Sequence, residues 1–105
     1  MAVSNEEILE KIKAVLQRVA PEATVILFGS RARRDYRAES DVDLLILLDQ
    51  EDLSIDDKKK ISYPLYDLEF EYGIVISPLI LTKHEWSSRP TLLRDNIDKE
   101  GVLML

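Results

Sequence analysis

The sequence predicts a single α/β domain that spans residues 1–105. Three observations support this prediction: a length that suits one domain, apolar residues that recur at helical spacing in several segments, and short apolar runs rich in β-branched residues between them. The run from Asp41 to Leu48 is apolar at nearly every inner position. It therefore predicts a strand that is buried on both faces at the centre of the sheet.

The first helix and the first strand are predicted from capping and turn residues. Ser4-Asn5-Glu6-Glu7 is a capping box, with Ser4 as the N-cap and Glu7 three residues later. Apolar residues at helical spacing follow, and the helix should end near Ala20 because Pro21 cannot continue it. Thr24 to Phe28 is β-branched and apolar, which predicts a strand.

A long helix and a third strand follow the central strand. Asp56 to Tyr72 has a helical pattern, with a kink or break expected at Pro64 and a stop at Gly73. Ile74 to Leu81 reads as a strand, and Pro78 within it predicts a sheet edge or a bulge.

The C-terminal part predicts a short turn, a helix and a short strand. Thr82-Lys83-His84-Glu85 is a second capping box, which opens the turn. Pro90 suits a helix start, and the helix itself should run from Thr91 to Glu100. Gly101 then closes this helix, and Val102 to Leu105 predicts a final short strand.

Composition excludes several classes of function. The net charge of −6 disfavours binding to a nucleic-acid backbone. No run approaches the ~18 apolar residues of a membrane span. The sequence has no cysteine, which excludes disulfides and thiolate metal sites. Because Met1 to Glu10 has no basic stretch followed by an apolar one, we expect no secretory signal and a cytoplasmic location.

The aromatic residues allow two interpretations. Trp86, Tyr63, Tyr66 and Tyr72 most simply fill the core or an interface. Alternatively, Tyr66 and Tyr72 form part of an exposed apolar patch on the long helix, which would suit a partner surface. Exposure depends on packing, so the sequence leaves both interpretations open.

A turn that suits phosphate follows the first predicted strand. Gly29 allows the backbone to approach a ligand closely, and Ser30 offers a hydroxyl and an N–H group. A short helix predicted from Arg31 to about Tyr36 would present free N–H groups at its start. Arg31 and Arg33 would add charged donors. Taken alone, the pattern also fits an ordinary strand-to-helix turn with solvated arginines.

Two carboxylates open the central strand. Asp41 and Asp43 are two residues apart, so both should point to the same side of the sheet while Val42 faces the core. Two hard oxygen ligands on one side suit Mg²⁺ together with substrate phosphates. The alternative is that the pair only solubilises a strand end, but neighbouring acids repel each other and favour a cation.

Together these segments resemble a known family. Gly29-Ser30-Arg31-Ala32-Arg33, followed by Ser40-Asp41-Val42-Asp43-Leu44, resembles the signature of the minimal nucleotidyltransferases of the DNA polymerase β superfamily. The closing stretch from Leu92 to Leu103 is also similar to that family, so the resemblance covers roughly Ile26 to Leu105.

The resemblance implies a fold, an activity and roles for the site residues. The fold would be the α/β (α+β) nucleotidyltransferase fold, a small mixed β-sheet flanked by helices. The activity would be transfer of a nucleoside monophosphate, expected to be AMP from ATP, to a hydroxyl. Gly29 and Ser30 would bind the β- and γ-phosphates, and Asp41 and Asp43 would act in catalysis by holding one or two Mg²⁺ ions.

The chain departs from the family pattern at two places. Arg34 stands where the family usually has glycine. Many members also carry a third carboxylate on a neighbouring strand, where it helps to activate the attacking hydroxyl. The corresponding segment here holds no acid: Ile74 is expected at that place, Ser77 can at most hydrogen-bond, and Glu69 and Glu71 are expected on the preceding helix.

Two functional hypotheses follow from the resemblance. In the first, the chain is a Mg²⁺-dependent enzyme and an antitoxin that transfers AMP to a tyrosine of a small helical HEPN-type toxin. In the second, it is a catalytically weak or inactive nucleotide-binding module that neutralises such a partner by forming a complex. The missing third acid is the main support for the second hypothesis.

Overall fold

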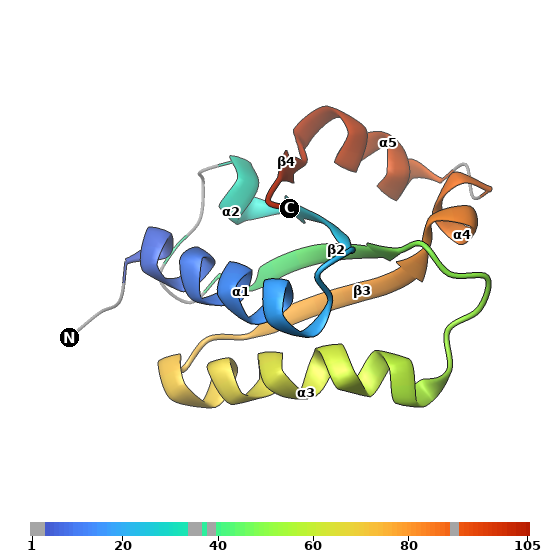
Figure 1. Ribbon diagram of the computed structural model, residues 1–105. Coiled ribbons are helices and arrows are strands. Elements are labelled where there is room, and N and C mark those ends of the chain that lie inside the picture. The colour runs from blue at the N-terminus through green and yellow to red at the C-terminus, as the bar shows by residue number, and fades with distance from the viewer. Residues whose placement is uncertain (1–3, 34–36, 38–39, 89–90) are drawn as a thin grey trace.

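The structure, a computed structural model, is a four-stranded mixed sheet with helices on both faces (Figure 1). It describes residues 4–33, 37, 40–88 and 91–105. Arg34, Pro90 and the predicted helix end at Tyr36 lie outside these ranges. The elements in chain order are α1 (Asn5–Val19), β1 (Thr24–Phe28), α2 (Ser30–Arg33), β2 (Val42–Leu48), α3 (Ile55–Tyr72), β3 (Ile76–Thr82), α4 (Lys83–Ser87), α5 (Leu92–Glu100) and β4 (Val102–Leu103).

The sheet has the strand order β3-β2-β1-β4. β1 runs antiparallel to both β2 and β4, whereas β2 and β3 are parallel. The predicted α/β fold with a small mixed sheet is confirmed, and β2 lies inside the sheet as predicted. Pro78 lies in the edge strand β3, where a missing N–H group is tolerated.

The two faces of the sheet carry different layers. On one face, α1 and α3 pack over the larger part of the core, which includes Ile12, Leu44 and Leu65. On the other face, Ile97 of α5 covers Leu45. Figure 1 shows α1 and α3 together on one side of the strands and α5 on the other. β2 is therefore covered on both faces, which explains its continuous apolar run.

Caps set most of the helix ends where the sequence predicted them. The Ser4 hydroxyl accepts the Glu7 N–H at 3.1 Å, and α1 ends at Val19. Gly73 closes α3 in the left-handed conformation, with φ of 65°. The capping box that Thr82 forms with Glu85 is also present.

The course of α3 and the start of β3 differ from prediction. α3 continues through Pro64 as one helix, so the chain does not break there. It begins at Ile55 because Ser54 and Asp57 form a further capping box. β3 begins at Ile76 rather than Ile74, two residues later than the apolar run suggested.

Within the described ranges, no helix is both long and apolar enough to cross a membrane.

The aromatic residues separate into two groups. Tyr72 packs partly buried against the α1–α3 core and Trp86 against the opposite cluster, whereas Tyr66 is exposed. Tyr72 is therefore a core residue and not part of a surface patch.

Candidate functional site

The antiparallel pairing of β1 and β2 brings the Gly-Ser turn and the two carboxylates together. Phe28, the last residue of β1, pairs with Asp43 near the start of β2. Gly29 and Ser30 directly follow Phe28, and Asp41 directly precedes β2. The end of one strand thus lies beside the beginning of the other, which makes one site from two segments of the sequence.

Gly29 lies directly against the carboxylate of Asp43. Its φ of 78° is in the left-handed region that favours glycine. A Cβ atom at this position would overlap Oδ2 of Asp43 and lie 3.2 Å from its Cγ. Glycine is therefore required here for two independent reasons, the backbone angle and the close approach of an acid.

The turn continues into a single helical turn. The N–H groups of Ala32 and Arg33 both donate to the Gly29 carbonyl at 3.1 Å. The described part of α2 covers only Ser30–Arg33. Ser30 is half-buried at the start of this turn, next to the contact between Gly29 and Asp43.

The side chain of Arg31 holds the two segments together. Only 3% of Arg31 is exposed. Its Nε and Nη2 donate to the Ser40 carbonyl at 3.1 and 2.8 Å, and its Nη1 donates to Oδ1 of Asn5 at 2.8 Å. The sequence suggested Arg31 as a phosphate donor, but these donors instead bond the residue that precedes Asp41. Arg31 acts as a positioning residue in this structure.

Arg33 lies on the exposed side of the turn. Its Nη1 forms an ion pair with Oε2 of Glu100 at 3.3 Å. Its positive charge also lowers the pKa of Asp43, which places the guanidinium close enough to act on the site. Arg33 is the arginine of the motif that stays at the surface beside the carboxylates.

The two carboxylates influence each other, as their spacing predicted. Burial raises the pKa of Asp43, the charge of Asp41 raises it further, and Arg33 lowers it. The net effect is a raised pKa. Asp41 itself is exposed. A half-buried acid destabilised by a neighbouring acid gains from a bound cation.

Ser77, and not Ile74, is the β3 residue beside Asp43. The parallel register pairs Asp43 with Ser77, which is exposed. Ile74 precedes the strand and packs against the α1–α3 core, so the sequence-based placement of the missing third acid at Ile74 was wrong. The expectation for Glu69 is confirmed: it belongs to α3, and its Oε1 accepts the Ile76 N–H at 2.9 Å.

The described residues hold no group of three or more acidic, histidine or cysteine side chains suited to a metal. The pair of carboxylates nevertheless fits Mg²⁺, which takes one or two protein carboxylates and completes its shell with water and phosphate. Asp41 and Asp43 are the residues that would hold it.

One hollow of the structure lies close to α2 but on the other face of the sheet from Asp43. This hollow has a volume of about 530 Å³, and Leu27 and Leu9 line it on the α1 side of the sheet. Asp43 belongs to the opposite face, because it alternates with Val42 and Leu44 of the α1–α3 core.

Two contributors to the site escaped the sequence analysis. Asn5 bonds Arg31 across 26 positions, so no local pattern pointed to it. Glu100 pairs with Arg33 across 67 positions. The cluster of arginines after the Gly-Ser turn was the available signal, and it did not reveal which partners the fold supplies.

The contact between Gly29 and Asp43 predicts unequal effects of alanine at two left-handed glycines. Gly73→Ala should cost about 1 kcal/mol, because φ is unfavourable but no atom lies within 4 Å of the new Cβ. Gly29→Ala should cost at least about 1 kcal/mol more, because Asp43 must also move. Urea unfolding of both variants measures the difference, and equal losses would contradict the close contact.

The raised pKa of Asp43 predicts a stability change with pH. The folded state binds this proton more tightly than the unfolded chain, so ionisation lowers the free energy of unfolding as pH rises through the folded pKa. Asp43→Asn should therefore be more stable than the unsubstituted protein near pH 7. The difference should vanish below the ordinary value of 3.8. Urea unfolding of both proteins across this range tests it, and equal stabilities near pH 7 would contradict the raised pKa.

Comparisons with known proteins agree with this geometry. Residues 10–105 match the family model described as polymerase beta, nucleotidyltransferase. A relative from Methanocaldococcus jannaschii, provisionally named a protein adenylyltransferase, is 37% identical over 98 residues, which cover 91% of this chain and 94% of the relative.

Solved structures share the fold. A protein provisionally described as a minimal nucleotidyltransferase superposes with a TM-score of 0.65 at 24% identity, covering 95% of each chain. A chain from the complex of a tri-AMPylated Shewanella oneidensis HEPN toxin with an MNT antitoxin gives a TM-score of 0.64 at 17% identity, covering 97% of this chain and 72% of the other. With the turn, the paired carboxylates and the sheet order in place, this chain belongs to the polymerase β family of nucleotidyltransferases.

Proposed function

We propose that this chain transfers AMP from ATP to a tyrosine hydroxyl of a small HEPN-type helical protein and thereby acts as its antitoxin. The observation that carries the proposal is the contact of the Gly29 turn with Asp43, next to Asp41. The relative named as a protein adenylyltransferase supports AMP and a protein acceptor. The structural neighbour bound to an AMPylated HEPN toxin supports the class of partner.

Each part of the site has a role in this reaction. The backbone of Gly29 and Ser30 would receive the β- and γ-phosphates, and Arg33 would add positive charge beside them. Arg31 would keep the carboxylate segment in register with the turn through Ser40. Bound at Asp41 and Asp43, Mg²⁺ would neutralise phosphate charge and help to align the leaving pyrophosphate.

The chemistry is an in-line substitution at the α-phosphorus. The acceptor oxygen forms a bond to phosphorus, the bond from phosphorus to the bridging oxygen breaks, and pyrophosphate leaves with the electron pair. The acceptor proton passes to a base. The net charge of −6 disfavours a nucleic acid as the acceptor, whereas a small protein presents no such repulsive backbone.

Incubation of the purified pair with ATP and Mg²⁺ tests the proposal by mass spectrometry. We expect the HEPN-type partner to gain one or more AMP units on tyrosine, and the double variant Asp41→Asn/Asp43→Asn to add none. The variant should still fold and bind the partner, because Asp41 is exposed and asparagine removes the repulsion at Asp43. A partner that stays unmodified by the unsubstituted chain would contradict transfer.

A second candidate function rests on Ser77. Because the neighbour of Asp43 on β3 is Ser77, this strand position supplies no acid to accept the proton. The chain would then bind nucleotide and neutralise its partner by forming a complex. Toxin neutralisation that survives in the double variant Asp41→Asn/Asp43→Asn would favour this function, whereas its loss in an intact complex would favour transfer.

The position of Ser77 yields a prediction of its own. Ser77→Asp should raise the rate of AMP transfer at least about tenfold, because it places a base next to Asp43. Ser77→Asn has nearly the same size without the charge and should leave the rate unchanged. Timed mass spectrometry at fixed ATP and Mg²⁺ gives the rates. Equal rates for both variants would mean that proton removal is not what limits transfer.

A further inference from the structure

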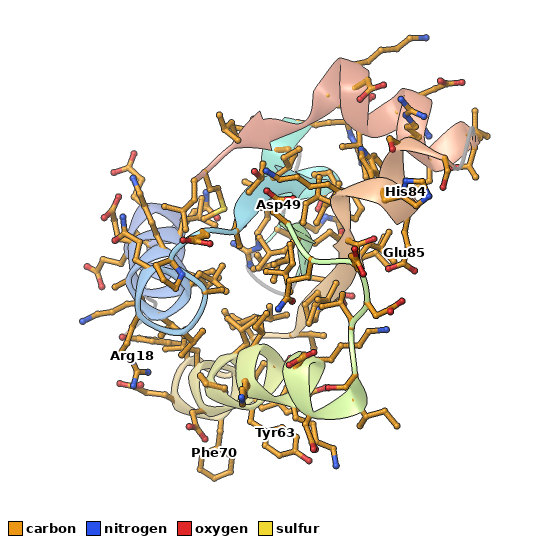
Figure 2. The ribbon with its side chains drawn as sticks, turned by 45° about the vertical axis from the view of Figure 1, so that its right-hand side comes forward. Arg18, Asp49, Tyr63, Phe70, His84 and Glu85 are labelled. Atoms are coloured by element: carbon orange, nitrogen blue, oxygen red, sulfur yellow. The ribbon has the colours of Figure 1, made fainter. Side chains whose placement is uncertain are left out.

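α3 carries an exposed stripe opposite to its buried face. Lys59, Tyr63, Tyr66 and Phe70, named here the α3 stripe, follow one another at intervals of four, three and four residues. The exposed fractions of Tyr63, Tyr66 and Phe70 are 55%, 48% and 94%. The opposite side of the same helix packs into the core through Ile61, Leu65 and Leu68. Figure 2 shows Tyr63 and Phe70 pointing away from the fold beyond α3.

The spacing of the α3 stripe is that of a helix–helix seam. Alternating intervals of three and four residues keep side chains on the line along which two helices pack. The rings of Tyr63 and Tyr66 are already in contact, with centroids 6.1 Å apart, and form the apolar centre of the stripe. Large aromatic side chains of this kind are enriched at the centres of protein interfaces.

Charge divides the exposed side of the helix into two halves. Lys58, Lys59 and Lys60 precede the aromatic centre, whereas Asp67 and Glu71 follow it, and all five are exposed. Asp56 and Asp57 of the first turn offset part of this positive charge, but the three lysines still outnumber these two acids. The surface is therefore basic on one side of the tyrosines and acidic on the other.

We propose that two copies of this chain associate through antiparallel packing of their α3 stripes. When the twofold axis lies between Tyr63 and Tyr66, Tyr63 of one copy faces Tyr66 of the second copy. The same register sets Lys59 against Phe70 and brings Lys60 of one copy close to Asp67 of the other, because these two side chains lie on the same flank of the stripe. A parallel arrangement would instead oppose like charges.

The dimer leaves the candidate active site uncovered. α3 packs on the sheet face that includes Leu44, whereas Asp43 belongs to the other face.

The 18 residues of α3 form a helix of about 27 Å, which gives a contact smaller than the ~800 Å² per partner of a standard interface. We therefore expect a weak, reversible and salt-sensitive dimer.

Sedimentation equilibrium of the full chain over a range of concentrations, at low and high salt, tests the proposal. Lys60→Glu and Asp67→Lys should each weaken the dimer about tenfold, because each places like charges together twice across the twofold axis. The chain that carries both substitutions should recover the dimer. Circular dichroism and urea unfolding check that neither single exchange changes the fold or the stability of the monomer.

Two matched variants test the apolar centre. Phe70→Gln removes the most exposed aromatic ring of the stripe, and Leu92→Gln removes an apolar side chain that is 76% exposed on α5. Phe70→Gln should abolish measurable dimer, whereas Leu92→Gln should leave the dissociation constant unchanged. Circular dichroism checks that both variants fold.

Two outcomes would overturn the proposal. A chain that stays monomeric up to several hundred µM, with a HEPN-type partner bound through the stripe instead, would assign the surface to that partner. A dimer that is unaffected by the single exchanges, or not restored by the double exchange, would place the contact elsewhere on the molecule.

Discussion

The close packing of the Gly29 backbone against the carboxylate of Asp43 is the constraint on which the site depends. It exists because β1 and β2 are antiparallel neighbours, so the end of one strand meets the start of the other. Any side chain at position 29 would push the acid away. The same contact partly buries Asp43 and leaves it beside Asp41, at a cost that a cation would offset. The Gly-Ser turn and the two carboxylates are thus one structural unit.

Arg31 links this unit to the neighbouring segments through hydrogen bonds. A buried guanidinium must find hydrogen-bond partners, and here it finds the Ser40 carbonyl and Asn5. The first ties the turn to the carboxylate segment, and the second ties both to the start of α1. The two arginines of the motif therefore have different tasks, since Arg31 positions the loop and Arg33 supplies charge at the surface.

The two faces of the sheet carry different exposed surfaces. Asp43 and Ser77 share the face that α5 partly covers, where a nucleotide and an acceptor would meet. The opposite face is closed by α1 and α3, whose outer side carries aromatic residues between halves of opposite charge. The carboxylates and the aromatic residues of α3 consequently lie on opposite sides of the sheet. That separation allows a partner or a second copy to bind without blocking the carboxylates.

The sequence by itself determined the α/β class, the central position of β2, most helix ends and the residues of the Gly29–Asp43 site, because these follow from local capping, short-range periodicity and a motif of fixed spacing. Only the tertiary structure decided that Arg31 is buried on Asn5 and Ser40, and that Ser77 rather than Ile74 stands beside Asp43. Those facts depend on contacts between distant segments and on strand register, where a shift of a residue or two changes which side chain meets which. The continuity of α3 through Pro64 belongs to the same group, since core packing of the flanking Ile61 and Leu65 outweighs the local preference of proline.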